Sequence, residues 1–205
     1  MEERYRNLVE NLPVGIGITS MEGKFLVANR TIQKMRGYDS REELMRTNVA
    51  ERYYDPKDRD RWLALIKEEG RVDGFEIRLK RKDSSIFWAS FNSILQTTVS
   101  GEQQIINVAQ DITERKKVEE ALRISEERYR NLIENLPVGV AINSPNGQTF
   151  MVNKALQEMA GYDSKEEQLR TPILEHYYDT KDRERWLALI KEKGKVKDAI
   201  SYKIG

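Results

Sequence analysis

The sequence predicts two tandem α+β domains joined by a long helix, and three observations carry this prediction. The stretch EERYRNLVENLPVGIGI, beginning at Glu2, returns as EERYRNLIENLPVGVAI, beginning at Glu126. Short strand-like runs alternate with helical patterns, and in the first copy three further strand-like runs follow them. Residues 111–137 carry apolar side chains at heptad spacing. So long a repeat indicates the duplication of a whole domain together with its leading helix.

The first copy begins with a helical pattern over residues 1–13, which ends at Pro13. Two β-type runs, 14–19 and 24–28, flank a turn that contains Gly23, and together they predict a hairpin. Asn29 is placed to cap a helix over 30–36, because its side chain can accept from the first free backbone N–H groups. Ser40, with Glu43 three residues later, has the spacing of a capping box and predicts another short helix.

A further helix is predicted to begin at Asp55, with Pro56 in its first turn and Gly70 at its end. Three alternating runs follow, over residues 72–80, 86–96 and 103–112, separated by turn sequences. Turns this short connect antiparallel strands, so the runs predict a meander. Two strands, several helices and three more strands make each complete copy an α+β domain.

The connecting helix is predicted to begin at Asp111, which forms a capping box with Glu114, and to end at Pro137. Its seam and the equivalent seam of the leading helix consist of Tyr5, Leu8, Leu12, Val118, Leu122, Tyr129, Leu132 and Leu136. One small domain cannot cover a helix of this length, so a homodimer with a coiled-coil interface is expected. The alternative is an amphipathic helix that lies on its own domain.

Composition narrows the classes of partner. Lysine and arginine number 35 against 34 acidic residues, which leaves a net charge of +1 and predicts no binding to nucleic acid or to an anionic membrane. The sequence has no apolar run long enough for a membrane span and no signal-like start, so a soluble cytoplasmic chain is expected. The absence of cysteine excludes disulfides and thiolate metal sites.

Several segments together resemble PAS sensory domains with their PAC segment. These segments are NLPVGI, the stretch from Asn29 through Tyr38 to Leu44, the loop at Asp55, the strand containing Asn92, and the closing DITER at Asp111. The resemblance implies a five-stranded antiparallel sheet of order 2-1-5-4-3, with helices around a cavity on one face. It also implies a sensor or dimerisation module for an output domain, commonly a histidine kinase, which acts on a response regulator in a two-component system, or a cyclic-dinucleotide enzyme.

On this basis the expected parts are a leading helix (1–13), a first PAS domain (14–112), a connector helix (113–137) and a second PAS domain (138–205). The second copy stops at Gly205, which is equivalent to Arg81, so its last two strands are expected to be missing. We therefore expect a fragment of a longer sensor protein; the alternative is a partner that supplies the strands.

The resemblance places a ligand cavity beside the helix that follows Asp55. The residues expected to line the cavity of the first copy are Tyr53, Tyr54, Trp62, Ile66, Phe75, Ile77 and Asn92. Aromatic side chains at helical spacing equally fit an ordinary core. Asn29 is explained by capping, whereas Asn92 lies within a strand and has no such explanation, which makes it the stronger ligand candidate.

No set of residues for catalysis or metal binding is present, so no enzyme activity is expected from this chain. The one histidine, His176, is replaced by Arg52 in the first copy, which argues against haem, and a cysteinyl-flavin adduct needs a cysteine. The expected function is a module that binds an unidentified small molecule and transmits the signal through a dimeric connector helix. The alternative is a ligand-free dimerisation scaffold.

Overall fold

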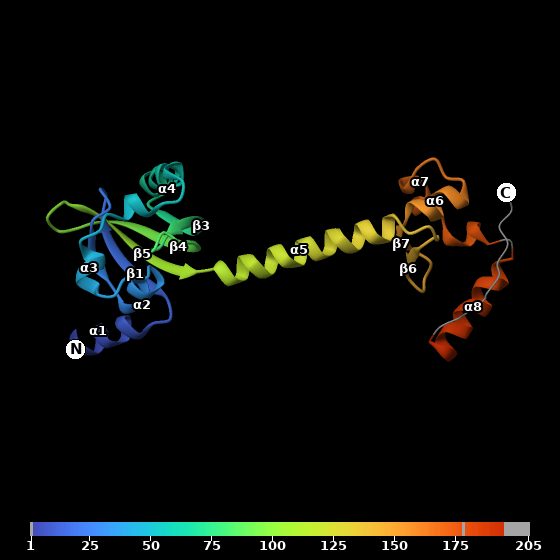
Figure 1. Cartoon of the computed structure of the whole chain (residues 1–205), viewed down its shortest axis with the longest axis horizontal. Helices are drawn as coiled ribbons and strands as arrows, with labels where there is room; N and C mark the ends of the chain where they lie inside the picture. The colour runs from blue at the N-terminus through green and yellow to red at the C-terminus, as the bar shows by residue number, and fades with distance from the viewer. Residues whose placement is uncertain (1, 178, 195–205) are drawn as a thin grey trace. The chain divides into compact units, whose positions relative to one another are not determined.

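The computed structural model describes residues 2–177 and 179–194 (Figure 1). The side chain of Tyr5, which belongs to the expected seam, lies outside this description, as does the side chain of His176 and the end of the second copy, residues 195–205. The chain divides into two compact units, Met1–Ala121 and Leu122–Gly205, and the division falls within one helix, α5 (Thr113–Glu134).

The first unit contains a five-stranded antiparallel sheet of order β2-β1-β5-β4-β3, as the resemblance implied. Its strands are β1 (Gly15–Ser20), β2 (Phe25–Ala28), β3 (Arg71–Lys80), β4 (Ile86–Thr97) and β5 (Gln103–Asp111). The last three form the predicted meander, because β3 pairs with β4 and β4 with β5. The hairpin β1–β2 joins this meander because β1 pairs with β5. The centre of the sheet is therefore formed by two strands that lie far apart in the sequence.

Four helical segments follow the hairpin and pack on one face of this sheet. They are α2 (Arg30–Met35), α3 (Arg41–Met45), the 3₁₀ turn η1 (Val49–Arg52) and α4 (Pro56–Glu69), and α1 (Glu2–Asn11) precedes the sheet. The caps predicted from the sequence are present: Asn29 accepts from Ile32 N–H, and Asp55 accepts from Lys57 N–H. The core between helices and sheet contains Phe25, Ile32, Leu44, Ile77, Leu79, Phe87 and Phe91.

Asn29 is a buried junction as well as a helix cap. It is 1% exposed, and its carboxamide makes four hydrogen bonds. Its Oδ1 accepts from the backbone N–H groups of Ile16 (2.9 Å) and Ile32 (3.0 Å), and its Nδ2 donates to the carbonyls of Val9 and Val14 (both 2.9 Å). One side chain therefore ties α1, β1 and α2 together.

The described part of the second copy repeats the beginning of the first. It has a two-stranded sheet of β6 (Ala141–Asn143) and β7 (Thr149–Val152), followed by α6 (Lys154–Ala160), α7 (Lys165–Arg170), the 3₁₀ turn η2 (Ile173–His176) and α8 (Thr180–Lys193). Asn153 reproduces the junction of Asn29: it accepts from Val140 and Leu156 and donates to Ile133 and Val138. The acceptor at Ile133 belongs to the last turn of α5.

The start of α5 differs from the predicted capping box. Asp111 is the last residue of β5, and its carboxylate accepts from Thr113 N–H at 2.9 Å and from the Arg81 guanidinium at 2.6 Å. The helix ends at Glu134, three residues before Pro137. The helix begins later than predicted because Ile112 N–H still donates to the carbonyl of Trp88. The β-ladder therefore continues to the residue directly before α5.

Candidate functional site

The cavity of the first copy lies between the sheet and helices α2 and α4, and it is nearly filled. It offers about 20 Å³ to a water-sized guest, which is little more than one water molecule needs. Two large side chains, Phe25 from β2 and Arg36 from the end of α2, occupy this space, and the guanidinium carbon of Arg36 lies 5.8 Å from the centre of the Phe25 ring. An organic ligand therefore has no room here.

Two of the residues expected to line this cavity do so. Tyr53 and Trp62 are 4% exposed and face it. Burial raises the pKa of Tyr53 to about 12, so its hydroxyl stays neutral. Ile66 belongs to α4 and packs with Val72 and Ile105. Ile77 belongs to the core of the first copy, and Phe75 is partly buried against it.

Tyr54 and Asn92 do not face the cavity, which corrects the expectation for both. Tyr54 is 41% exposed and stacks with the Arg78 guanidinium at 4.3 Å. Asn92 is exposed on the other face of β4, and its Oδ1 accepts from Gly74 N–H at 2.8 Å. Gly74 has a positive φ and lies where the β3–β4 register shifts, so Asn92 stabilises a β-bulge.

The buried polar residues on the cavity face of the sheet include Thr19, Ser93 and Asn107, which the sequence interpretation missed. Trp62 Nε1 donates to Ser93 Oγ at 3.3 Å, and Ser93 Oγ donates to Asn107 Oδ1 at 2.8 Å. The alternation of β4 contained the signal, because Phe87 and Phe91 point inward, which puts Ser93 inward and Asn92 outward.

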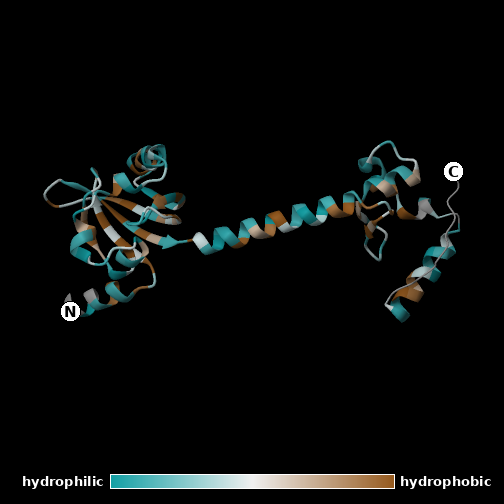
Figure 2. Cartoon of the chain, in the orientation of Figure 1, coloured by the Kyte–Doolittle hydropathy of each residue, from teal (hydrophilic) through white to brown (hydrophobic). Residues whose placement is uncertain are grey.

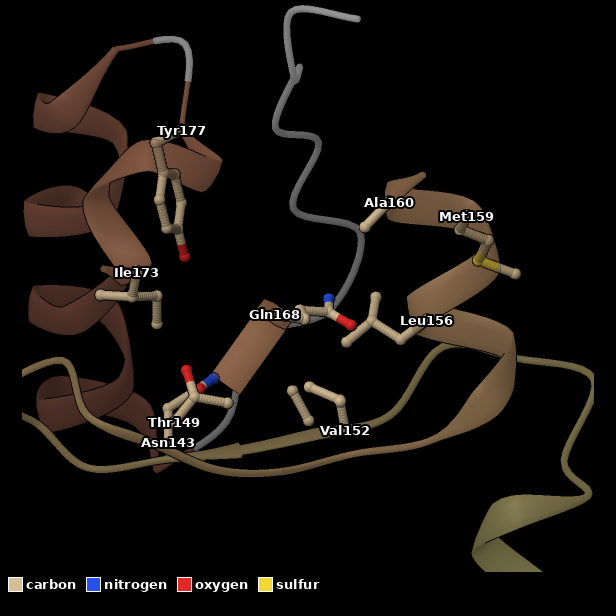
Figure 3. Close-up of a pocket in the computed structure, with 10 residues that line it drawn as sticks. Asn143, Thr149, Val152, Leu156, Met159, Ala160, Gln168, Ile173 and Tyr177 are labelled. Atoms are coloured by element: carbon tan, nitrogen blue, oxygen red, sulfur yellow. The ribbon is translucent and has the colours of Figure 1, made fainter. Parts of the chain in front are cut away.

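The equivalent cavity of the second copy is open among the described residues, where β6 and β7 alone form the sheet. It offers about 300 Å³, the lower end of the usual range for small-molecule pockets, roughly 300 to 1,000 Å³. The two residues that fill the first cavity have small counterparts: Thr149 occupies the place of Phe25, and Ala160 occupies the place of Arg36. Ile173 lines it from η2, and Tyr177, the counterpart of Tyr53, lines it from the position directly after η2 (Figure 3).

Gln168 gives the second cavity its most informative polar group. It occupies the place of Leu44, is 3% exposed, and its Oε1 has no hydrogen-bond partner among the described residues. Figure 3 shows the carboxamide between α6 and the strands, beside Leu156 and Val152. A buried carbonyl without a donor is costly, so a guest that donates a hydrogen bond would be favoured at this position.

Among the described residues, the lining of the second cavity contains no Asp, Glu, Lys, Arg or His side chain. Asn143, Thr149, Gln168 and the Tyr177 ring supply the polar groups, and the remaining contacts come from side chains such as Val152, Leu156 and Met159. A charged guest would lose its hydration without finding a counter-ion among these described residues, so this part of the lining favours uncharged molecules. No group of three or more His, Cys, Asp or Glu side chains in the described ranges is placed to hold a metal ion.

The expected seam residues other than Tyr5, whose side chain is not described, are exposed within the chain. Val118 and Leu122 are 61% and 59% exposed, Tyr129 and Leu132 are 66% and 57%, and Leu8, Leu12 and Leu136 are also exposed. Figure 2 shows hydrophobic residues along α5 interspersed with hydrophilic ones. A surface of this kind on a long helix has the pattern of a partner-binding face.

The first turn of α5 is attached to the sheet by charged groups. Glu76 on β3 pairs with Arg115 at 2.6 Å and with Lys116 at 2.5 Å. Hydrogen bonds from Lys116 and then from Arg115 hold the pKa of Glu76 below its usual range. Together with the pair between Arg81 and Asp111, these contacts couple the position of the helix to the sheet.

The comparisons with known proteins agree with this architecture. Residues 3–112 match the PAS fold, and residues 127–192 match the PAS domain. The chain therefore belongs to the PAS family and carries two PAS sensory domains in tandem. Within the part that the structure describes, no helix has the length and apolar character of a membrane span.

Two curated relatives are signalling proteins. The chain is 27% identical over 129 residues to the sensor protein TdiS of Thauera aromatica, which covers 60% of this chain and 23% of the relative. It is 29% identical over 126 residues to the sensor histidine kinase TmoS of Ectopseudomonas mendocina, which covers 59% of this chain and 13% of the relative. The chain thus spans less than a quarter of either relative.

Among solved structures, an RNA-binding light-oxygen-voltage receptor shares the fold. The similarity has a TM-score of 0.52 at 20% identity and covers 62% of this chain and 37% of the receptor. The matching relatives and the fold make this chain a PAS sensory segment of the kind found in sensor histidine kinases.

Proposed function

We propose that this chain senses a small uncharged molecule in its second PAS copy and transmits the signal through a dimeric α5. One observation carries the proposal: the cavity of the first copy is nearly filled, whereas the described residues of the second copy, which include no counterparts of β3, β4 and β5, border about 300 Å³. Thr149 and Ala160 are smaller than their counterparts Phe25 and Arg36 and contribute to this difference. The guest would have an apolar body and at least one hydrogen-bond donor, which would satisfy Gln168 Oε1.

Transmission would run through the contacts of α5 at its two ends. Asn153 donates to the Ile133 carbonyl at 3.0 Å, so a change around α6 in the second copy reaches the last turn of the helix. Lys165 on α7 also pairs with Glu134. A guest that binds better to one arrangement of α6 and α7 would therefore bias the packing of α5.

The exposed seam of α5 would allow two chains to dimerise and so pass the signal to an output domain. Two copies of α5 would bury Val118, Leu122, Tyr129 and Leu132 against each other in a coiled coil. In a longer protein this pairing would bring output domains together, and the relative TmoS is itself named a sensor histidine kinase. The alternative, a ligand-free scaffold, is favoured for the first copy by its filled cavity.

The experiment transfers the filling side chains of the first copy into the second. A panel of neutral fragments that carry hydroxyl or amide groups is screened by saturation-transfer NMR against the chain and against Thr149→Phe/Ala160→Arg. Fragment binding should be lost in the double variant, because the two side chains refill the cavity.

Glu158→Arg is the matched control, since it adds an arginine to the exposed side of α6 and should leave binding unchanged. Gln168→Leu should weaken fragments that donate hydrogen bonds by about tenfold, the equivalent of about 1.4 kcal/mol. Equal binding to the chain and to the double variant would exclude the second cavity as the receptor site.

A further inference from the structure

Arg36 is a buried cation that lacks a counter-ion. The residue is 3% exposed, and its Nε and Nη1 atoms are buried without an acceptor. No carboxylate in residues 2–177 or 179–194 forms an ion pair with it, and the contact that the structure does show is with the face of the Phe25 ring. An arginine so deeply buried normally has a carboxylate or another anion beside it.

The charge on Arg36 persists despite its surroundings. Burial lowers the pKa of the guanidinium; Tyr53 and Tyr38 oppose this shift and Arg52 adds to it, but arginine remains protonated in proteins at neutral pH. The ring of Phe25 offers a weak electrostatic partner and no hydrogen-bond acceptor. The arrangement therefore needs negative charge that the described side chains do not supply.

Two neighbouring side chains also have buried donors without a hydrogen-bond acceptor. The hydroxyl of Tyr38 and the Nε of Arg52 are both buried without a partner, and the Arg52 guanidinium lies 6.0 Å from the centre of the Tyr38 ring. Arg36 and Arg52 are two cations near one another, which raises the local positive potential. A site with unused N–H donors and two positive charges favours an anion.

The size of the cavity limits what the anion can be. The space beside Arg36, Tyr53 and Thr19 is about 20 Å³, enough for one species of the size of a water molecule. Water could accept hydrogen bonds from the guanidinium, but it would leave the charge unbalanced. An organic carboxylate with a body of several carbon atoms does not fit.

We propose that the first PAS copy binds one small monovalent anion of about the size of chloride on the Arg36 guanidinium. The second copy has Ala160 at the equivalent position and would not hold the anion. This site is separate from the neutral-ligand cavity of the second copy, and either one can exist without the other. The anion would complete the core of the first copy and make its stability depend on the kind of salt present.

The direct test uses crystals of the complete chain grown or soaked in sodium bromide, because bromide replaces chloride and is located by anomalous scattering. We expect a bromide peak at hydrogen-bond distance from Arg36 in the wild-type chain and none there in Arg36→Met. No peak beside Arg36 in the wild-type crystals would overturn the proposal, and this holds even if the variant does not fold.

A solution measurement provides the second test. The denaturation midpoint of the first copy is compared in sodium chloride and in sodium gluconate at equal ionic strength, because gluconate is too large for the cavity. Chloride should raise the wild-type midpoint relative to gluconate, as any ligand that binds the folded state does. The difference should disappear in Arg36→Met and persist in Arg30→Met, which removes an exposed cation from the same helix. An equal chloride effect in Arg36→Met would refute the site.

Discussion

Replacing Asn29 by alanine should destabilise the first PAS copy more than any ordinary helix-cap substitution. The side chain makes four hydrogen bonds of 2.9 to 3.0 Å, to backbone groups of Val9, Val14, Ile16 and Ile32. A net value of about 0.5 to 1.5 kcal/mol for each bond gives a loss of about 2 to 6 kcal/mol. We expect a value near the middle of this range, about 4 kcal/mol, which is a large share of a domain's stability.

The assay is urea denaturation followed by tryptophan fluorescence in a Trp186→Phe background, so that the signal comes from Trp62 and Trp88 in the first copy. Asn29→Ser is the matched comparison, because serine can still cap α2 but cannot donate to Val9 and Val14. It should lose about half as much stability as Asn29→Ala. A loss below about 1 kcal/mol in Asn29→Ala would mean that this junction is replaced by water and does not hold α1 to the sheet.

Two further outcomes follow from α5. Leu122→Glu with Leu132→Glu places two charges in the exposed seam of each chain and should convert a dimer to a monomer in analytical ultracentrifugation, whereas an unchanged sedimentation coefficient would exclude the helix interface. Glu76→Gln should loosen the first turn of α5 at neutral pH, measured as a lower heteronuclear NOE at Lys117. In the wild-type chain the attachment should be complete above the ordinary glutamate pKa of 4.5 and be lost as the pH falls through the lower pKa of folded Glu76; an unchanged NOE in Glu76→Gln at neutral pH would contradict the role of this pair.

The junctions formed by Asn29 and Asn153 show why duplication preserves some contacts and changes others. Both asparagines make the same four kinds of bond, because their partners are backbone groups that any sequence provides. The cavities depend instead on side chains: Phe25 and Arg36 of the first copy correspond to Thr149 and Ala160 of the second, while the hairpin and the helices that follow it are present in both copies. Two copies with one backbone plan can therefore differ in what they bind.

The sequence by itself determined the duplication, the strand and helix order and most helix ends, because these depend on local spacing. Asn29 and Asp55 cap the helices they were predicted to cap, and the alternating runs form the predicted strands. The predictions from sequence that were wrong concern residues whose contacts depend on a neighbouring strand. Asn92 was interpreted as a cavity residue, but the bulge at Gly74 gives it a partner on the outer face of the sheet.

Only the tertiary structure decided which side chains meet in each cavity. The burial of Arg36 without a carboxylate and of Gln168 without a donor follows from the packing of α2, α7 and their sheets, and neither residue is unusual in its local sequence. The physical reason is that capping and periodicity act over three or four neighbouring residues, whereas desolvation depends on every element that closes around a group. Local sequence therefore specified the helices and strands, and long-range packing specified which side chains are buried in each cavity.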